Sequence, residues 1–116
     1  MKPVLVFHNP RCSKSRQALA LLDSRNIQYK TFLYLENEII YDEFLRILGL
    51  LKIKPRDILR VKEKEYLENN LNNMSLTDDD IIKIVLKNRK LIERPIVIKG
   101  EKAVIARPPE KVLQVL

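Results

Sequence analysis

Hydrophobic positions in the first third of the chain follow two patterns, a short continuous run and a helical spacing. The apolar run Val4–Phe7 stops before Asn9-Pro10, which predicts a buried strand leading into a loop. Between residues 13 and 25 the apolar side chains share one helical face, and Asn26 is suited to the left-handed conformation that ends a helix. Residues 28–35 are rich in aromatic and β-branched side chains and predict a second strand. Together these segments predict a β-α-β unit.

The middle of the chain has the spacing of helices. The first expected helix has apolar residues at i, i+3, i+4 and i+7, with Gly49 as its end; these residues are Tyr41, Phe44, Leu45 and Leu48. Pro55 is expected to open a short helical turn, and residues 62–70 predict a further helix. Thr77 is a good N-cap for the next helix, whose apolar face is formed by Ile81, Ile82, Val85 and Leu86.

The C-terminal part returns to strands. Residues 96–98 and 103–105 flank Lys99-Gly100-Glu101-Lys102, which is typical of a hairpin turn. After Pro108-Pro109, the positions of Val112, Leu113 and Leu116 predict a terminal helix. The order of elements predicts one α/β domain over residues 1–116, with a helical insertion at about 41–90 between the two halves of a mixed sheet.

Composition narrows the classes of protein that this chain can represent. A chain of 116 residues with 46% hydrophobic side chains can bury one core. Its opening apolar run is too short for a signal peptide, and no run approaches the roughly 20 residues that span a bilayer. A single cysteine excludes an internal disulfide, so disulfide chemistry needs a thiol from another molecule. We therefore expect a cytoplasmic protein without membrane attachment.

The charge balance favours anionic ligands. Lys and Arg number 22 against 15 Asp and Glu, a net charge of +7. The basic residues are interleaved with acidic ones, as in Lys62-Glu63-Lys64-Glu65, which is typical of a solvated surface. The chain has no arginine-rich tail and no alternation of basic and aromatic residues, so the sequence gives little support to nucleic-acid binding.

The segment from His8 to Arg16 carries most of the chemical information. It follows a strand and enters a helix, so the first helical amides should point toward Cys12 and stabilise an anion there. Lys14, together with Arg11 and Arg16, adds positive charge, and both effects favour thiolate over thiol. The same loop is suited to holding a tetrahedral oxyanion through backbone amides and the hydroxyls of Ser13 and Ser15.

Two side chains of this segment have competing interpretations. A lone cysteine is by default a small buried apolar residue, whereas the loop position and basic neighbours of Cys12 favour a nucleophile. His8 is either a proton donor or hydrogen-bond partner for the thiol, or a structural residue at a strand end. Cys12 and Ser15 form a C-x-x-S arrangement, which lacks the resolving cysteine of a dithiol motif.

Two arginines precede prolines on either side of the expected hairpin. Arg94-Pro95 and Arg107-Pro108 restrict the backbone of each arginine, so both side chains are expected at the same end of the sheet. A guanidinium is suited to bidentate binding of an oxyanion. The alternative is two surface arginines beside turn prolines, and Arg60, with less local support still, would be a surface residue by default.

With these residues in view, the chain resembles the arsenate reductase family, the glutaredoxin-coupled branch of the thioredoxin-like fold. The matching segments are His8-Asn9-Pro10-Arg11-Cys12 through Ser15-Arg16, then Glu93-Arg94-Pro95-Ile96-Val97, and Arg107-Pro108-Pro109-Glu110. The resemblance covers essentially the whole chain. Ser13-Lys14 departs from the Gly-Thr that follows the cysteine in members with established arsenate activity, and the chain is closest to a compact subgroup with a Cys-Ser-Lys-Ser loop.

The resemblance implies a thioredoxin-like fold and an arsenate reductase serving arsenic resistance. It implies a nucleophilic Cys12 and an oxyanion site completed by Arg60, Arg94 and Arg107. His8, Ser15 and Lys14 would support the thiolate, and Pro95 corresponds to the position of a cis-proline that faces the cysteine loop. No bound cofactor or metal is implied; glutathione would be the co-substrate and glutaredoxin the protein partner.

Two other functions remain open at this point. A Spx-like regulator would bind RNA polymerase, although Ser15 stands where its disulfide switch has a second cysteine. A general glutathione-dependent reductase would need no arsenate. The three arginines that accompany the cysteine loop favour arsenate reduction.

Overall fold

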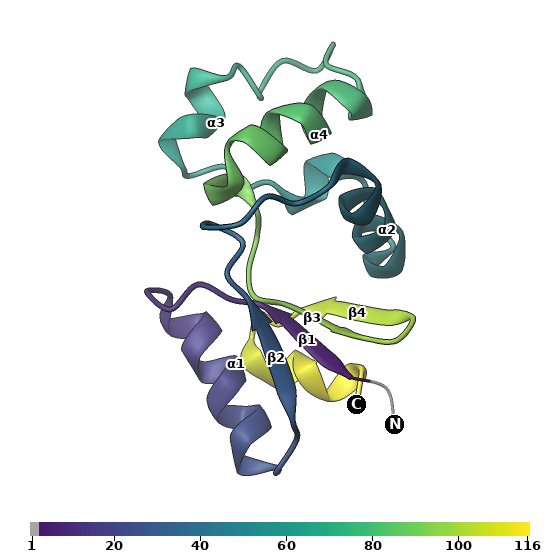
Figure 1. Ribbon diagram of the computed structural model, residues 1–116. Helices are drawn as coiled ribbons and strands as arrows, with labels where there is room; N and C mark the ends of the chain where they lie inside the picture. The colour runs from purple at the N-terminus through teal and green to yellow at the C-terminus, as the bar shows by residue number, and fades with distance from the viewer. Residues whose placement is uncertain (1–2) are drawn as a thin grey trace. The chain divides into compact units, whose positions relative to one another are not determined.

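The computed structural model describes residues 3–116, and the chain forms two compact units (Figure 1). One unit consists of Met1–Asn37 and Arg94–Leu116, and the other of Glu38–Glu93. The second unit lies in the sequence between the two segments of the first, as expected for a helical insertion between the halves of the sheet. That all 116 residues form one domain stays a prediction.

A four-stranded mixed sheet organises the first unit. Its strands follow the order β2-β1-β3-β4 and comprise β1 (Val4–Phe7), β2 (Tyr29–Phe32), β3 (Ile96–Lys99) and β4 (Lys102–Ile105). Strand β1 is parallel to β2 and antiparallel to β3, and β4 is antiparallel to β3. Helix α1 (Ser13–Ser24) connects the parallel pair, and Gly100 turns the hairpin with a φ of 61°. The thioredoxin-like α/β prediction is confirmed.

The core of this unit forms on the side of the sheet that carries α1. Helix α1 and the terminal 3-10 helix Pro109–Gln114 both cover this side (Figure 1). Alternate residues of a strand point to the same face, and here they meet apolar residues of both helices. The buried cluster consists of Val4, Val6, Ala18, Leu22, Val97, Ala106, Val112 and Val115. This packing fixes α1 against β1, and with it the loop that joins them.

The expected apolar face of the terminal helix is partly wrong. The segment is a 3-10 helix, with about three residues per turn, so Val112 and Val115 share its buried face. Leu113 is instead 41% exposed, and Leu116 is exposed as well. The prediction assumed an α-helical period of 3.6, which places the wrong leucines inward.

The second unit is helical. It comprises α2 (Tyr41–Leu51), a 3-10 turn at Pro55–Ile58, α3 (Lys64–Glu68), α4 (Asp78–Lys87) and a 3-10 turn at Arg89–Leu91. The Thr77 hydroxyl accepts a hydrogen bond from the Asp80 amide at 3.1 Å, while the Thr77 amide donates to the Asp80 carboxylate at 3.0 Å. This reciprocal pair confirms Thr77 as the N-cap of α4.

Helix α2 departs from the expectation in two places. It continues past Gly49 to Leu51, and Lys52 takes the left-handed conformation with a φ of 58°. Leu45, expected on the apolar face, is 50% exposed, and Ile47 is buried in its place. Phe44, Ile47 and Leu48 form the buried face at the spacing i, i+3 and i+4, so the expected face is rotated from Leu45 toward Ile47. Strand β2 and helix α3 are shorter than the segments 28–35 and 62–70 expected for them.

No helix within residues 3–116 combines the length and the apolar character that a bilayer crossing requires.

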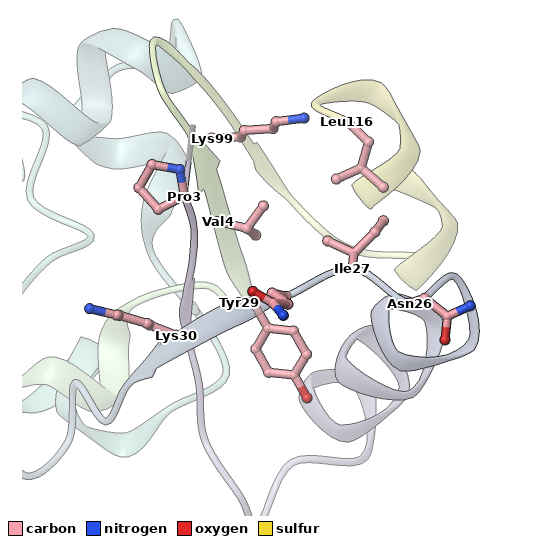
Figure 2. Close-up of a pocket in the computed structure, with 9 residues that line it drawn as sticks. Pro3, Val4, Asn26, Ile27, Tyr29, Lys30, Lys99 and Leu116 are labelled. Carbon is pink, nitrogen blue, oxygen red and sulfur yellow. The ribbon is translucent and has the colours of Figure 1, made fainter. Parts of the chain in front are cut away.

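A hollow of about 650 Å³ opens in the first unit at the end of the sheet where β1 begins (Figure 2). Its lining is mainly apolar, with two lysines, and consists of Pro3, Val4, Asn26, Ile27, Gln28, Tyr29, Lys30, Lys99 and Leu116. None of the site residues expected from the sequence lines it. The cysteine loop follows the other end of β1, so the hollow and the expected site belong to opposite ends of that strand.

Candidate active site

Cys12 occupies the N-cap position of α1. Its backbone is extended, with φ −94° and ψ 123°, and its carbonyl accepts the first helical hydrogen bond from the Arg16 amide at 3.0 Å. The amides of Ser13 and Lys14 have no acceptor within the helix, because the first turn of any helix leaves its N–H groups unpaired. These amides and the helix dipole stabilise negative charge at the helix start. The cysteine is 8% exposed. This burial alone does not distinguish a nucleophile from a small buried apolar residue.

Ser15 holds the loop to the first turn of α1. It is completely buried, and its Oγ lies 2.7 Å from His8 Nδ1 and 3.1 Å from the Asn9 amide, which donates to it. Because Oγ accepts from Asn9, its own proton is available for an unprotonated Nδ1. Ser15 therefore joins the end of β1, the loop and the helix at one buried hydroxyl.

Further backbone and side-chain bonds close the loop on itself. The Asn9 carbonyl accepts from the Cys12 amide at 3.0 Å, and the Asn9 side chain accepts from the Arg11 amide at 3.0 Å. The exposed Arg16 donates from Nη1 to the Pro10 carbonyl at 2.8 Å. Lys14 is half-buried, whereas Arg11 and Arg16 are exposed. These contacts fix the backbone around Cys12 by hydrogen bonds within residues 8–16.

His8 is held in its neutral form. Burial lowers the pKa of His8 below 6.5, and the positive charge of Arg16 lowers it further. A neutral imidazole accepts the Ser15 hydroxyl proton at Nδ1, in agreement with the hydrogen-bond arrangement. The hydrogen bond between His8 and Ser15 supports the structural interpretation of His8, and the proton-donor role stays a prediction.

We expect the only histidine of the chain to titrate below pH 6.5 in the folded protein. Since the folded-state pKa is lower than the unfolded value, His8 contributes stability that is present above about pH 6.5 and is lost as the pH falls through the folded value. The NMR titration of the single imidazole measures the midpoint. The His8→Gln variant should lose less stability than the wild type between pH 7 and pH 5, as read from urea unfolding. A midpoint above 6.5 would contradict the prediction.

The strand register brings three parts of the expected site to one edge of the sheet. Phe7, the last residue of β1, lies opposite Ile96, the first residue of β3, and Ile96 lies opposite Ile105. The loop of Cys12 follows Phe7, Arg94-Pro95 precedes Ile96, and Arg107 follows shortly after Ile105. The Ala106 amide extends this ladder by donating to the Pro95 carbonyl at 2.8 Å. The expectation that Arg94 and Arg107 leave the same end of the sheet agrees with this register.

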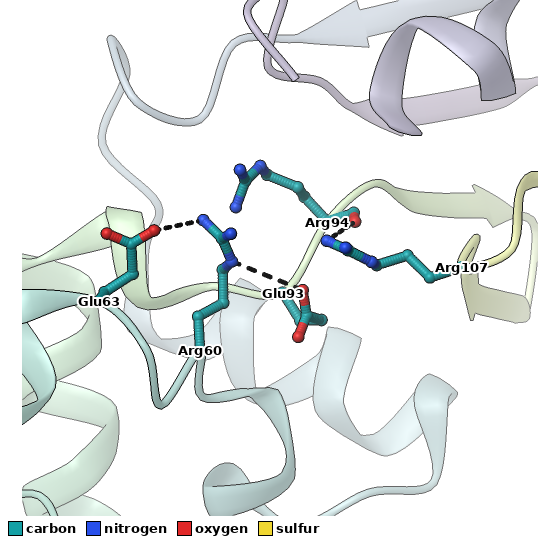
Figure 3. Close-up of polar contacts among 5 residues, drawn as sticks. All are labelled: Arg60, Glu63, Glu93, Arg94 and Arg107. Atoms are coloured by element: carbon teal, nitrogen blue, oxygen red, sulfur yellow. Dashed lines mark hydrogen bonds and ion pairs between the residues drawn. The ribbon is translucent and has the colours of Figure 1, made fainter. Parts of the chain in front are cut away.

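Arg94 and Arg107 are both half-buried, and the side chain of Arg107 contacts the backbone of Arg94 (Figure 3). Arg107 Nη1 donates to the Arg94 carbonyl at 3.5 Å. The Nε of Arg94 is buried and has no hydrogen-bond partner among the described residues. Arg94-Pro95 and Arg107-Pro108 are both cis. A buried guanidinium N–H without an acceptor is a feature of a site prepared for an anionic ligand.

Arg60 belongs to the second unit, where two carboxylates hold its guanidinium (Figure 3). Its Nη1 lies 2.6 Å from Glu63 Oε1, and its Nε lies 3.6 Å from Glu93 Oε1. The side chain is 23% exposed and paired, so Arg60 is not the solvated surface residue expected by default. Neither glutamate was predicted as a partner from the sequence, although Glu63 stands three residues after Arg60.

Within residues 3–116, no group of three or more His, Cys, Asp or Glu side chains is arranged to hold a metal ion.

A family model, sequence relatives and solved structures all relate this chain to the same family. A family model described as the ArsC family matches residues 7–115. An arsenate reductase of Haemophilus influenzae is 44% identical over 114 residues, covering 97% of this chain and 98% of that protein. The uncharacterized protein YfgD of Escherichia coli is 42% identical over 118 residues, covering 99% and 98%. The solved structure of an arsenate reductase from Vibrio cholerae has a TM-score of 0.95 at 40% identity, covering 99% of this chain and 98% of that one.

Proposed function

The chain belongs to the ArsC family, and from this premise we propose that it reduces arsenate to arsenite with Cys12 as the nucleophile. The observation that carries the proposal is the shared sheet edge. The loop with Cys12 follows the end of β1. The two arginine-proline pairs flank the neighbouring strands β3 and β4 at the same end of the sheet. An attack on arsenate needs a nucleophile close to oxyanion-binding groups, and a common end of the sheet supports such an arrangement.

The anion-binding groups of the first unit match the charge of arsenate. Among residues 3–116 the buried Arg94 Nε has no acceptor, and an arsenate oxygen would supply one. Arg107 adds a second guanidinium, and the free amides at the start of α1 add oriented dipoles. These groups would also stabilise the charge that builds up on the oxygens when sulfur attacks arsenic. Arg60 is proposed as a third guanidinium for the oxyanion by the family resemblance alone.

The first chemical step is a substitution at arsenic. The Cys12 thiolate forms a sulfur–arsenic bond, and one arsenate oxygen leaves as hydroxide, or as water once it takes up a proton. Arsenic stays in the +5 state in this step, because an oxygen ligand is exchanged for a sulfur ligand. Lys14 and the helix dipole support the thiolate, while His8, Ser15 and Pro95 hold the loop and its surroundings in shape.

The second step transfers electrons. A glutathione thiolate attacks the Cys12 sulfur, the sulfur–arsenic bond breaks, and its electron pair stays with arsenic, which becomes As(III). The product on the protein is a mixed disulfide between Cys12 and glutathione. A glutaredoxin thiolate then attacks the glutathione sulfur and releases the Cys12 thiolate. Each arsenate is thus reduced at the expense of two thiols, neither of which belongs to this chain.

The test is arsenate-dependent oxidation of glutathione by the wild-type protein. We expect turnover with glutathione and glutaredoxin together and little turnover when thioredoxin replaces glutaredoxin, because a lone cysteine leaves a glutathione mixed disulfide to be resolved. Absence of arsenite in the complete assay would end the proposal. Reduction of glutathione mixed disulfides without any response to arsenate would instead establish the general glutathione-dependent reductase.

A further inference from the structure

The backbone around Arg60 is fixed by a short ladder inside the second unit. Leu59 and Ile92 form an antiparallel bridge, and both are buried. The Arg60 amide donates to the Leu91 carbonyl at 2.8 Å, and the Glu93 amide donates to the Ile58 carbonyl at 2.8 Å. Since successive residues alternate between faces, Arg60 and Glu93 lie diagonally on the same face of this ladder.

A turn adds the second carboxylate. The Glu63 amide donates to the Arg60 carbonyl at 3.1 Å, which places Glu63 at the start of α3 and beside the arginine. Its Oε1 then accepts from Arg60 Nη1 at 2.6 Å, a length typical of a strong charge-assisted bond (Figure 3). Glu93 approaches Nε at 3.6 Å from the ladder side.

These two contacts restrict how Arg60 binds another anion. A guanidinium binds an oxyanion through an edge made of two nitrogens, either Nε with Nη2 or Nη1 with Nη2. Each of these edges contains one nitrogen that already lies beside a carboxylate. An incoming oxyanion therefore approaches a nitrogen that already has a carboxylate beside it, and it meets the negative charge of both glutamates.

We propose that Glu63 and Glu93 are positioning residues that hold Arg60 and lower its attraction for the substrate oxyanion. The inference rests on the proposed function, because it concerns how tightly Arg60 binds arsenate in that reaction. The glutamates keep the guanidinium in one orientation between turnovers, and they make oxyanion binding at Arg60 weaker than a free arginine would allow.

Glu63→Gln is the informative variant, because it removes one charge and keeps the shape of the side chain. We expect the Kd and the KM for arsenate to fall about three- to tenfold, a modest effect because the Glu63 side chain is 28% exposed and partly screened. The kcat should change less than about twofold, since sulfur attack itself is not altered. Kd is measured by calorimetry with arsenate on the reduced protein, and KM with glutathione and glutaredoxin at the same ionic strength.

Glu68→Gln is the matched control, because Glu68 is an exposed residue of the same helix and the change removes the same charge. It should leave both constants near the wild-type values. An unchanged or higher Kd in Glu63→Gln, or an equal fall in Glu68→Gln, overturns the inference while the arsenate activity of the wild type stands. If the wild type neither binds nor reduces arsenate, the proposed function fails, and the inference fails with it.

Discussion

Cys12→Ser is expected to lower arsenate reduction by at least about a thousandfold and to leave the fold intact. An alcohol at this position is not ionised near neutral pH and forms no disulfide, so neither the attack on arsenic nor the reaction with glutathione takes place. The helix should not suffer, because serine is a preferred N-cap residue and Cys12 occupies that position. Arsenite formation in the complete assay measures the loss.

Two measurements separate lost chemistry from lost structure. The Cys12→Ser variant should melt at or above the wild-type temperature, and calorimetry should still detect arsenate binding, because the arginines and helix amides remain. Iodoacetamide should label the wild type, which has a single cysteine, and arsenate should slow that labelling. Activity above a tenth of the wild-type rate in the variant would exclude Cys12 as the nucleophile.

Arg94→Gln is expected to raise the KM for arsenate about ten- to a hundredfold. The buried Nε of Arg94 has no acceptor among the described residues, so an arsenate oxygen placed there gains a charge-assisted bond that a neutral amide replaces only in part. The loss is large because the group is buried and water does not compensate fully. Steady-state kinetics with varied arsenate and saturating glutathione measure the change.

Arg25→Gln controls for the loss of one positive charge in the same unit. Arg25 is exposed and follows the end of α1, far along the helix from Cys12. It should change the KM less than about twofold at moderate ionic strength. A similar rise in both variants would mean that net charge alone attracts arsenate, and an unchanged KM in Arg94→Gln would remove this arginine from the substrate site.

The parts of the fold that local chemistry determines could be predicted from the sequence. Strand β1 and the start of α4 follow from an apolar run and from Thr77 as a capping residue, and both predictions are confirmed. The end of α2 was wrong because a glycine also fits inside a helix at modest cost, and here Lys52 takes the left-handed conformation at the helix end. The face of the terminal helix was wrong because the sequence does not distinguish a 3-10 period from an α period over six residues.

The candidate site was predictable to a similar degree. The loop, the helix start and the two arginine-proline pairs were placed correctly because each depends on neighbouring residues and on the hairpin between them. Long-range partners were not accessible in this way. The contact of Arg60 with Glu93 depends on a bridge between segments more than thirty residues apart, so no local sequence pattern predicts it.

The buried hydroxyl of Ser15 has a consequence for how such a protein fits into cellular redox metabolism. In dithiol proteins the position three residues after the cysteine provides an internal reductant. Here it is Ser15, whose hydroxyl joins the end of β1, the loop and α1. A sulfhydryl in its place would sacrifice those bonds. Under the proposed function, each turnover would therefore draw its electrons from thiols of other molecules, and the rate of arsenate reduction would follow the supply of those thiols.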